Sequence, residues 1–382
     1  MKKFTSLLLV FVLLCGLLVF SVGAEEKTQL RFKEDGTFTI LQLSDPQDDK
    51  NISKELIAFI EKAIEETQPD LIVITGDIVE DSRPVIDVNG DDKPLLEGVK
   101  NKDYATALAD TKATVEQIFA PIEESGIPYA VTQGNNDYNS GVTNEDWLAI
   151  YAQFSNCLTI DESTDAEGKI DQYLPILSSD SDAPAFGLWM LDNGKDFTEG
   201  QMQWMQEYNT NGVPGIVFEH VPTDDIGNLF EECKPWDDGA FADGTTAYRL
   251  NKSIATGHAE YAHEPGVKTD EFALWQEQNV IGAFFGHEHT CGYTGEVDGI
   301  VMGMTYGCQF AKFGPYGIRT LTLQEATGTF TTELYTYENG VFTLQEDDGD
   351  YETYDKSIGA FFAKIANVFK YILRSVLYLI KI

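Results

Sequence analysis

Side chains of the kinds that bind metal ions follow five apolar runs of this chain, each at the point where the run ends. They are Asp45 with Gln47, Asp77, Asn135 with Asp137, His220, and His287 with His289. Carboxylate, amide and imidazole groups together suit borderline or hard cations such as Zn, Fe or Mn. The chain has five histidines, and three of them stand at these run ends. One such residue has an ordinary structural explanation, but the recurrence favours a shared metal site.

The run Leu71–Ile74 is the clearest of the five. Its four β-favouring residues lead directly into Thr75-Gly76-Asp77, which is typical of a strand buried on both faces in a parallel sheet. Glycine permits a tight turn there. We therefore expect Asp77 just beyond the carboxyl end of the strand, where open α/β sheets place their ligand sites.

Helix and strand patterns alternate through the first half of the chain. Strand patterns at Thr37–Leu43 and Leu71–Ile74 flank a helical stripe from Ile52 to Ile64, which predicts a βαβ unit with parallel strands. The further predicted elements are a helix from Leu108 to about Gly126, a strand at Tyr129–Thr132, a strand at Phe186–Leu191, a helix at Phe197–Tyr208, and a strand at Ile216–Phe218.

The second half is richer in strands. A helix near Asp270–Gln278 and a strand at Val280–Phe285 precede three more predicted strands, near Ile300–Thr305, Ile318–Leu323 and Thr329–Tyr337. Residues 82–103 and 223–267 are polar and are expected to form loops, while residues 139–182 carry weak signals. Long loops of this kind often serve as lids or mobile segments.

Composition limits the classes of partner. The formal net charge is −37, and loss of residues 1–24 with their two lysines would lower it to −39. So acidic a surface repels phosphate backbones, which argues against nucleic acid as a partner. Four cysteines would remain, at positions 157, 233, 291 and 308. They allow three pairings, of which we favour Cys291 with Cys308, because these two flank a predicted hairpin.

The two ends of the chain differ from the middle. Lys2-Lys3, the apolar run Leu7–Phe20 and the small residues up to Ala24 predict a secretory signal at residues 1–24. Residues 354–382 have apolar side chains on one helical face and basic ones on the other. This pattern is typical of an amphipathic helix on a membrane surface, with docking on the protein's own acidic surface as the alternative. We expect a secreted or extracytoplasmic protein, held at the membrane surface if the first interpretation is correct.

The motifs SDPQ, TGDIVED, QGNNDYN, FEHVP and FGHEHT occur in this order over residues 38–290. In order, spacing and strand context they resemble the signature of the calcineurin-like metallophosphoesterase superfamily, in its purple acid phosphatase-like branch. The resemblance implies an α/β fold, a four-layer α/β/β/α sandwich, over about residues 28–340. Cys291-Gly292 and Tyr306-Gly307-Cys308 are also similar to that branch.

The resemblance further implies two divalent or trivalent metal ions as cofactors. One would be held by Asp45, Asp77 and His289, with Gln47 beside it. The other would be held by Asp77, Asn135, His220 and His287, so that Asp77 bridges the pair. Two ions ~3.5–4 Å apart would polarise a phosphate ester and activate a hydroxide for in-line attack. The expected substrates are small phosphomonoesters, with phosphodiesters as an alternative.

Two positions depart from the family pattern. Gln47 stands where the first motif has a histidine, and a neutral amide is a weaker ligand. Asn136 stands where the family has the histidine that contacts phosphate and helps to protonate the leaving group, beside Asp137 of the same catalytic motif. An asparagine can donate a hydrogen bond but supplies no proton at neutral pH, and loss of a general acid typically costs ~10²–10⁴ in rate.

These departures leave three outcomes open. The enzyme could act on esters with good leaving groups, which need no acid. His258 or His263 could supply the proton instead. The third outcome is a non-catalytic surface protein that binds metal and phosphate on the same fold. A separate zinc protease is not supported, because His258 and His263 are five residues apart rather than the four of H-E-x-x-H.

Overall fold

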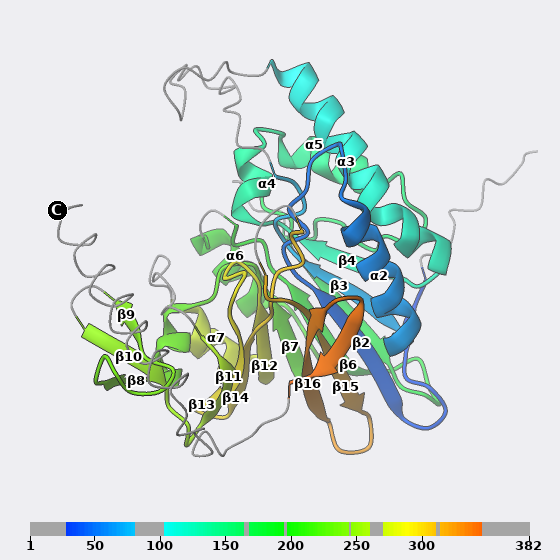
Figure 1. Ribbon diagram of the computed structural model, residues 1–382. Helices are drawn as coiled ribbons and strands as arrows, with labels where there is room; N and C mark the ends of the chain where they lie inside the picture. The colour runs from blue at the N-terminus through cyan, green and yellow to red at the C-terminus, as the bar shows by residue number, and fades with distance from the viewer. Residues whose placement is uncertain are drawn as a thin grey trace, which may run out of the picture.

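The computed structural model describes residues 28–80, 103–163, 168–194, 197–243, 246–259, 270–310 and 314–345. Within these residues the chain forms two large sheets that pack face to face, with helices on both outer faces (Figure 1). The architecture is the expected four-layer α/β/β/α sandwich. The predicted signal at residues 1–24 and the predicted helix at residues 354–382 lie outside the described residues.

The first sheet has six strands in the order β17-β16-β15-β2-β3-β4. Strands β2, β3 and β4 are parallel, which confirms the predicted βαβ unit. The strands are β2 (Thr37–Leu43), β3 (Leu71–Thr75), β4 (Tyr129–Thr132), β15 (Tyr316–Gln324), β16 (Thr329–Glu338) and β17 (Val341–Leu344).

The second sheet has eight strands in the order β1-β5-β6-β7-β12-β14-β13-β11, and β6, β7, β12 and β14 are parallel. Its strands are β1 (Leu30–Arg31), β5 (Gln172–Leu177), β6 (Pro184–Met190), β7 (Gly215–Phe218), β11 (Ala255–His258), β12 (Val280–Phe285), β13 (Gly292–Val297) and β14 (Ile300–Met304). The predicted hairpin between Cys291 and Cys308 is present as β13 and β14.

Helices cover the outer faces of the two sheets. Figure 1 shows α2 (Lys54–Thr67) and α3 (Tyr104–Ser125) on one side, and α6 (Glu199–Glu207) and α7 (Glu271–Glu277) on the other. Ser53 caps the start of α2 by accepting from the backbone N–H of Leu56, as a helix N-cap does. The remaining helical segments are α4 (Asn135–Asn139), α5 (Asn144–Tyr151) and the 3₁₀ turn η1 (Asp224–Leu229).

Three separate apolar cores lie between the four layers. Alternate residues of β3 face opposite ways: Ile72 and Ile74 pack beneath α2 and α3, whereas Leu71 and Val73 pack against the second sheet. The third core joins the second sheet to α6 and α7. Alternation along a strand buried on both faces explains why this run shows no polar positions in the sequence.

Three expectations were wrong or incomplete. Residues 223–267 are not a loop where they are described, because they form η1, the three-stranded sheet β8-β10-β9 and the edge strand β11. The added strands are β8 (Phe230–Cys233), β9 (Phe241–Asp243) and β10 (Thr246–Leu250). Residues 139–182 contain α5 and β5, whose mixed composition hid their periodicity.

The expected disulfide between Cys291 and Cys308 is also wrong for this structure. Both residues are buried thiols, and Cys308 Sγ donates to the backbone oxygen of Ser44 at 3.1 Å. No helix in the described part of the chain combines the length and the apolar character needed to cross a bilayer.

Candidate metal centre

Strand ends from both sheets meet at one edge of the sandwich. Asp45, Gln47 and Asp77 follow β2 and β3 of the first sheet, while His220 and His287 follow β7 and β12 of the second. The parallel strands that carry these residues end at the same edge, which is why segments far apart in sequence converge there.

Asp45, Asp77 and His289 form the first ligand group. One ligand atom from each lies within 4.8 Å of the others, and His289 Nε2 is 3.1 Å from Asp45 Oδ1. Asp45 is fully buried, and its Oδ1 accepts no hydrogen bond from the described residues. Its Oδ2 accepts from the backbone N–H of His287 at 3.0 Å and from the Ser44 hydroxyl.

His220, His287, Asn135 and Asp77 form the second group. Asn135 Oδ1 lies 3.0 Å from His220 Nε2 and 2.8 Å from His287 Nδ1. His220 Nε2 lies 3.3 Å from both His287 Nδ1 and Asp77 Oδ1. Asp77 belongs to both groups, as a bridging ligand would.

The chemistry of the second group fits a cation. His220 Nδ1 lies 2.9 Å from the backbone oxygen of Thr75, and a carbonyl only accepts, so Nδ1 carries the proton. In the neutral ring Nε2 then carries a lone pair, and this lone pair faces Asn135 Oδ1 and Asp77 Oδ1. Ligand atoms ~2.1 Å from one metal ion are ~3.0–3.4 Å apart in octahedral or tetrahedral geometry. The observed separations match this spacing.

The pKa shifts follow from the same concentration of negative charge. Burial lowers the pKa of His220, but the Asp77 carboxylate outweighs it and raises the pKa to about 10. Burial raises the pKa of Asp45, but His289 and His220 outweigh it and hold the pKa well below the usual value. Charge that favours a proton on His220 also favours a metal cation among these ligands.

The backbone at the site is held in an uncommon conformation. Four residues that carry the predicted ligands have positive φ: Asp45 (50°), Gln47 (38°), Asp77 (50°) and His287 (73°). Non-glycine residues adopt this region at an energetic cost and occur disproportionately at functional sites. The strained backbone at the strand ends therefore directs these side chains toward the site at a cost in local stability.

Glycines allow the ligand loops to approach each other. A Cβ at Gly76 would come within 2.7 Å of both the backbone nitrogen of Gly134 and Nδ1 of His220. A Cβ at Gly134 would collide with the backbone nitrogen and Oδ1 of Asp77. The β3 and β4 ends are consequently in direct backbone contact, which brings Asn135 to Asp77.

The two amides that depart from the family pattern both contact Asp77. Gln47 Nε2 donates to Asp77 Oδ2 at 3.3 Å, and Asn136 Nδ2 donates to the same oxygen at 2.6 Å. The backbone N–H of Asn136 donates to Asp77 Oδ1 at 2.7 Å. The structure thus places both residues at the site, where they act as donors to the shared carboxylate.

Asp137 lies beside the cluster and faces away from it. Its carboxylate is fully buried and accepts from three backbone N–H groups, those of Ile78 (2.9 Å), Val79 (3.2 Å) and Gly134 (2.8 Å). Burial and the Asp77 carboxylate raise its pKa to about 8, although the Gly134 and Val79 amides act in the opposite direction. These contacts join the β3 and β4 ends.

His258 is not among the clustered ligands. His258 is exposed at the end of β11, where its Cα pairs with Gly292, three residues beyond His289. Its predicted role as a proton donor stays a prediction. His263 lies outside the described residues.

The sequence reasoning missed the turn Asp192-Asn193-Gly194, which follows β6. Asn193 Oδ1 accepts from the backbone N–H groups of His220 (3.1 Å) and Val221 (2.9 Å). The sequence does carry a signal for this turn, because polar residues and a glycine follow β6 as they follow β3 and β4. It was overlooked because none of the three residues is a histidine.

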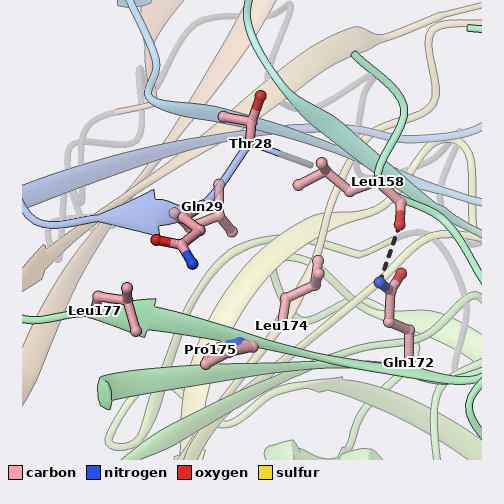
Figure 2. A pocket seen from close by; sticks show the side chains of 8 residues that line it. Thr28, Gln29, Leu158, Gln172, Leu174, Pro175 and Leu177 are labelled. Atoms are coloured by element: carbon pink, nitrogen blue, oxygen red, sulfur yellow. Dashed lines mark hydrogen bonds between the residues drawn. The ribbon is translucent and has the colours of Figure 1, made fainter. Parts of the chain in front are cut away.

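A separate apolar cavity of about 300 Å³ lies against the β1 and β5 edge (Figure 2). It is lined by Thr28, Gln29, Leu30, Leu158, Gln172, Leu174, Pro175 and Leu177. None of these side chains titrates, and none belongs to the ligand cluster.

Comparisons with known proteins agree with this geometry. Residues 38–291 match the model of a family described as calcineurin-like phosphoesterase. A relative from Arabidopsis thaliana named "probable inactive purple acid phosphatase 14" is 24% identical over 365 residues, covering 82% of this chain and 80% of that protein. Another from the same plant, "probable inactive purple acid phosphatase 28", is 22% identical over 71% of this chain and 70% of its own length.

Two solved structures were also found to be similar. A dimetal phosphatase from Danio rerio has a TM-score of 0.45 at 11% identity, with 78% of this chain and 95% of that chain covered. GAP50 of Plasmodium, described as the anchor in the inner membrane complex, has a TM-score of 0.44 at 11% identity, with 87% and 95% covered.

Proposed function

Because the chain belongs to the calcineurin-like phosphoesterase family, we propose that it is an exported hydrolase of small phosphomonoesters that uses two metal ions. The observation that carries this proposal is the pair of ligand groups that share Asp77. Asp45 and His289 complete one group, and the second draws on Asn135, His220 and His287. The donor set suits Fe, Zn or Mn.

The metal pair would supply the positive charge that a phosphate ester needs and that this acidic chain lacks. When bound, the two ions would neutralise the charge of the ester and activate a water molecule for attack. Among the proposed ligands, Asn135, His287 and His289 are half-buried, as is the neighbouring Asn136, while the others are buried. A substrate would therefore approach on this side, with the Asn136 amide near the leaving group.

The absence of a histidine at position 136 bears on the choice of substrate. An amide holds a hydrogen bond to a leaving oxygen but transfers no proton. Aryl and other good leaving groups depart without a proton, whereas alkyl alkoxides need one. We therefore propose esters with good leaving groups as the preferred substrates, and phosphodiesters as the alternative class.

The function is tested by metal content and hydrolysis measured together. Purified protein is loaded with Mn, Zn or Fe, its metal content is determined, and hydrolysis of an aryl phosphomonoester and an aryl phosphodiester is followed. We expect two ions per chain and turnover of the monoester. Asp77→Asn is the control, because it weakens both ligand groups at once and should remove both metal and activity.

A second candidate function has its own support. Asn136 replaces the histidine of the family motif, and two relatives carry names that call them probably inactive. A non-catalytic protein that binds metal and phosphate on the same fold would take up two ions but hydrolyse neither ester. The same experiment separates the two functions, since only hydrolysis differs between them.

The location is a separate part of the proposal. The basic, apolar and small-residue pattern of residues 1–24 supports export, and the amphipathic pattern of residues 354–382 supports attachment to a membrane surface. Determination of the mature N-terminus tests the first point, which predicts a start after Ala24. Deletion of residues 354–382 tests the second, and a full-length mature protein absent from membrane fractions would contradict it.

A further inference from the structure

The turn Asp192-Asn193-Gly194 lies between two of the ligand loops. It follows β6, the strand next to β7, whose end carries His220. Asp192 is fully buried and Asn193 is nearly so. The turn makes side-chain contacts with the His220 loop and backbone contacts with the Asn135 loop, although none of its residues belongs to the predicted ligands.

Asn193 holds the His220 loop with every polar atom of its side chain. Its Oδ1 accepts from the backbone N–H groups of His220 and Val221. Its Nδ2 donates to Glu219 Oε2 at 3.0 Å and to the backbone oxygen of Val221 at 2.5 Å. One amide therefore fixes the three consecutive residues around the ligand.

Gly194 packs against the other loop. A Cβ at this position would lie 2.6 Å from the carbonyl carbon of Gly134 and 2.8 Å from the backbone oxygen of Gln133. These neighbours are backbone atoms, so they can move away only if the loop moves. Because Asn135 follows Gly134 directly, any side chain at position 194 would displace a predicted ligand.

Asp192 anchors the turn to the body of the protein. Its Oδ2 accepts from the hydroxyl of Tyr138 at 2.7 Å and from the backbone N–H of Ile170 at 3.0 Å. Its backbone oxygen accepts from Gln201 Nε2 at 2.9 Å. The turn is thus fixed on one side to α4 and α6, and on the other side it sets the separation of two ligand loops.

We propose that Asn193 and Gly194 are positioning residues for the second metal position, the one formed by His220, Asn135 and His287. This inference rests on the two-metal part of the proposed function. It predicts that damage to the turn weakens the binding of one of the two ions selectively. The hydrogen bonds of the turn described above run to the His220 loop, α4 and α6, whereas Asp45 and His289 lie on other loops.

The test compares Asn193→Ala and Gly194→Ala with the unaltered full chain, using Mn²⁺ as the probe. Loss of the groups that orient a metal ligand typically costs 10–100-fold in metal affinity. We expect the second Mn²⁺ to bind ~10–100-fold more weakly in each variant, while the first is retained. Metal analysis should fall from two ions to one per chain, and the EPR spectrum should change from a coupled pair to an isolated ion.

Two control variants match the chemistry away from the turn. Asn156→Ala removes another amide that holds a backbone group, since Asn156 Nδ2 donates to the backbone oxygen of Glu123 at 3.2 Å. Gly227→Ala adds a methyl group where nothing lies within 4 Å. Both controls should keep two ions with unchanged affinity.

The outcomes separate the inference from its premise. If the unaltered chain binds fewer than two ions, the two-metal proposal fails. If it binds two and both turn variants also bind two with unchanged affinity, the positioning role is wrong. Loss of both ions together would also contradict it, because that result indicates general damage to the fold rather than to one position.

Discussion

Asn136 binds both oxygens of Asp77, with its side-chain amide 2.6 Å from Oδ2 and its backbone nitrogen 2.7 Å from Oδ1. One residue at the start of α4 thus orients the carboxylate that both ligand groups share. A proton donor at this position would have to protonate the leaving group and also hydrogen-bond to Asp77. An asparagine orients Asp77 but supplies no proton to the leaving group.

Asn136→His should therefore extend activity to poor leaving groups. A histidine supplies a transferable proton, and general acid catalysis contributes ~10²–10⁴ in rate. We expect hydrolysis of an alkyl phosphomonoester to rise by about 10²-fold, while hydrolysis of an aryl ester changes little. The measurement is kcat/KM for the two esters at equal metal loading.

Asn136→Gln serves as the control for this substitution. It changes the shape of the side chain without adding a proton, so the ratio of alkyl to aryl rates should stay as it is in the unaltered protein. An equal rise for both esters in Asn136→His would show that the histidine acts through metal binding instead of leaving-group protonation.

Metal binding should stabilise the folded protein measurably. A ligand present at 100 times its Kd adds ~2.7 kcal/mol to the free energy of unfolding, which corresponds to a rise in Tm of about 5–10 °C for a large domain. We expect a chelator to lower Tm by this amount and Mn²⁺ or Zn²⁺ to restore it. In Asp77→Asn the Tm should no longer respond to either treatment.

The sequence positions of the predicted ligands follow a local rule. Leu71–Thr75 is apolar at every position before Thr75, so the strand and its polar end can be read without knowing the fold. The same holds for β4, β7 and β12, whereas β2 also carries Thr37, Thr39 and Gln42 among its apolar residues. Their convergence follows from parallel pairing, since parallel strands end on one edge of a sheet.

What the sequence could not supply is the direction in which each polar group points. Asp137 stands in the same motif as Asn135, yet in the described part of the chain its carboxylate accepts from the backbone N–H groups of Ile78, Val79 and Gly134. Asn193 belongs to none of the sequence motifs, and nevertheless its side chain accepts a hydrogen bond from the backbone N–H of His220. The strands of residues 223–267 were missed because β8 and β10 are short, polar on one side and stabilised by pairing with each other.

Asp171 should make stability fall as pH rises. Burial and the neighbouring Asp192 carboxylate raise its pKa to about 8, and its Oδ2 has no hydrogen-bond partner among the described residues. The folded state therefore binds this proton more tightly than the unfolded state, whose pKa is ~3.9. Between about pH 4 and pH 8 the unfolding free energy should decrease.

Asp171→Asn should remove this dependence. The asparagine Oδ1 can still accept from Gln201 and from the backbone N–H of Asp192, as the carboxylate does now. Urea unfolding should show the variant more stable than the unaltered protein by ~1–3 kcal/mol at pH 8 and nearly equal to it at pH 4. Asp180→Asn, on an exposed side chain, should change neither value. A larger gain at pH 4 than at pH 8 would contradict the assignment.

Arg319 should be indispensable to the packing of the two sheets. It is fully buried on β15, and the acceptors of its five N–H groups are Thr294 Oγ1, Thr332 Oγ1, Thr305 Oγ1 and the backbone oxygens of Tyr293 and Met304. Burial lowers its pKa to about 9. The guanidinium is held by hydrogen bonds to neutral oxygens from both sheets.

Arg319→Lys keeps the charge but offers three donors for five acceptors, so buried oxygens lose their partners. Each unsatisfied buried group costs ~1–3 kcal/mol, and we expect a loss of about 3 kcal/mol in the free energy of unfolding. Arg249→Lys is the matched control, because Arg249 forms a partly exposed ion pair with Glu231 at 2.7 Å, worth at most ~1 kcal/mol. Because both variants keep the charge, equal losses in the two would contradict a role for the five-donor geometry at position 319.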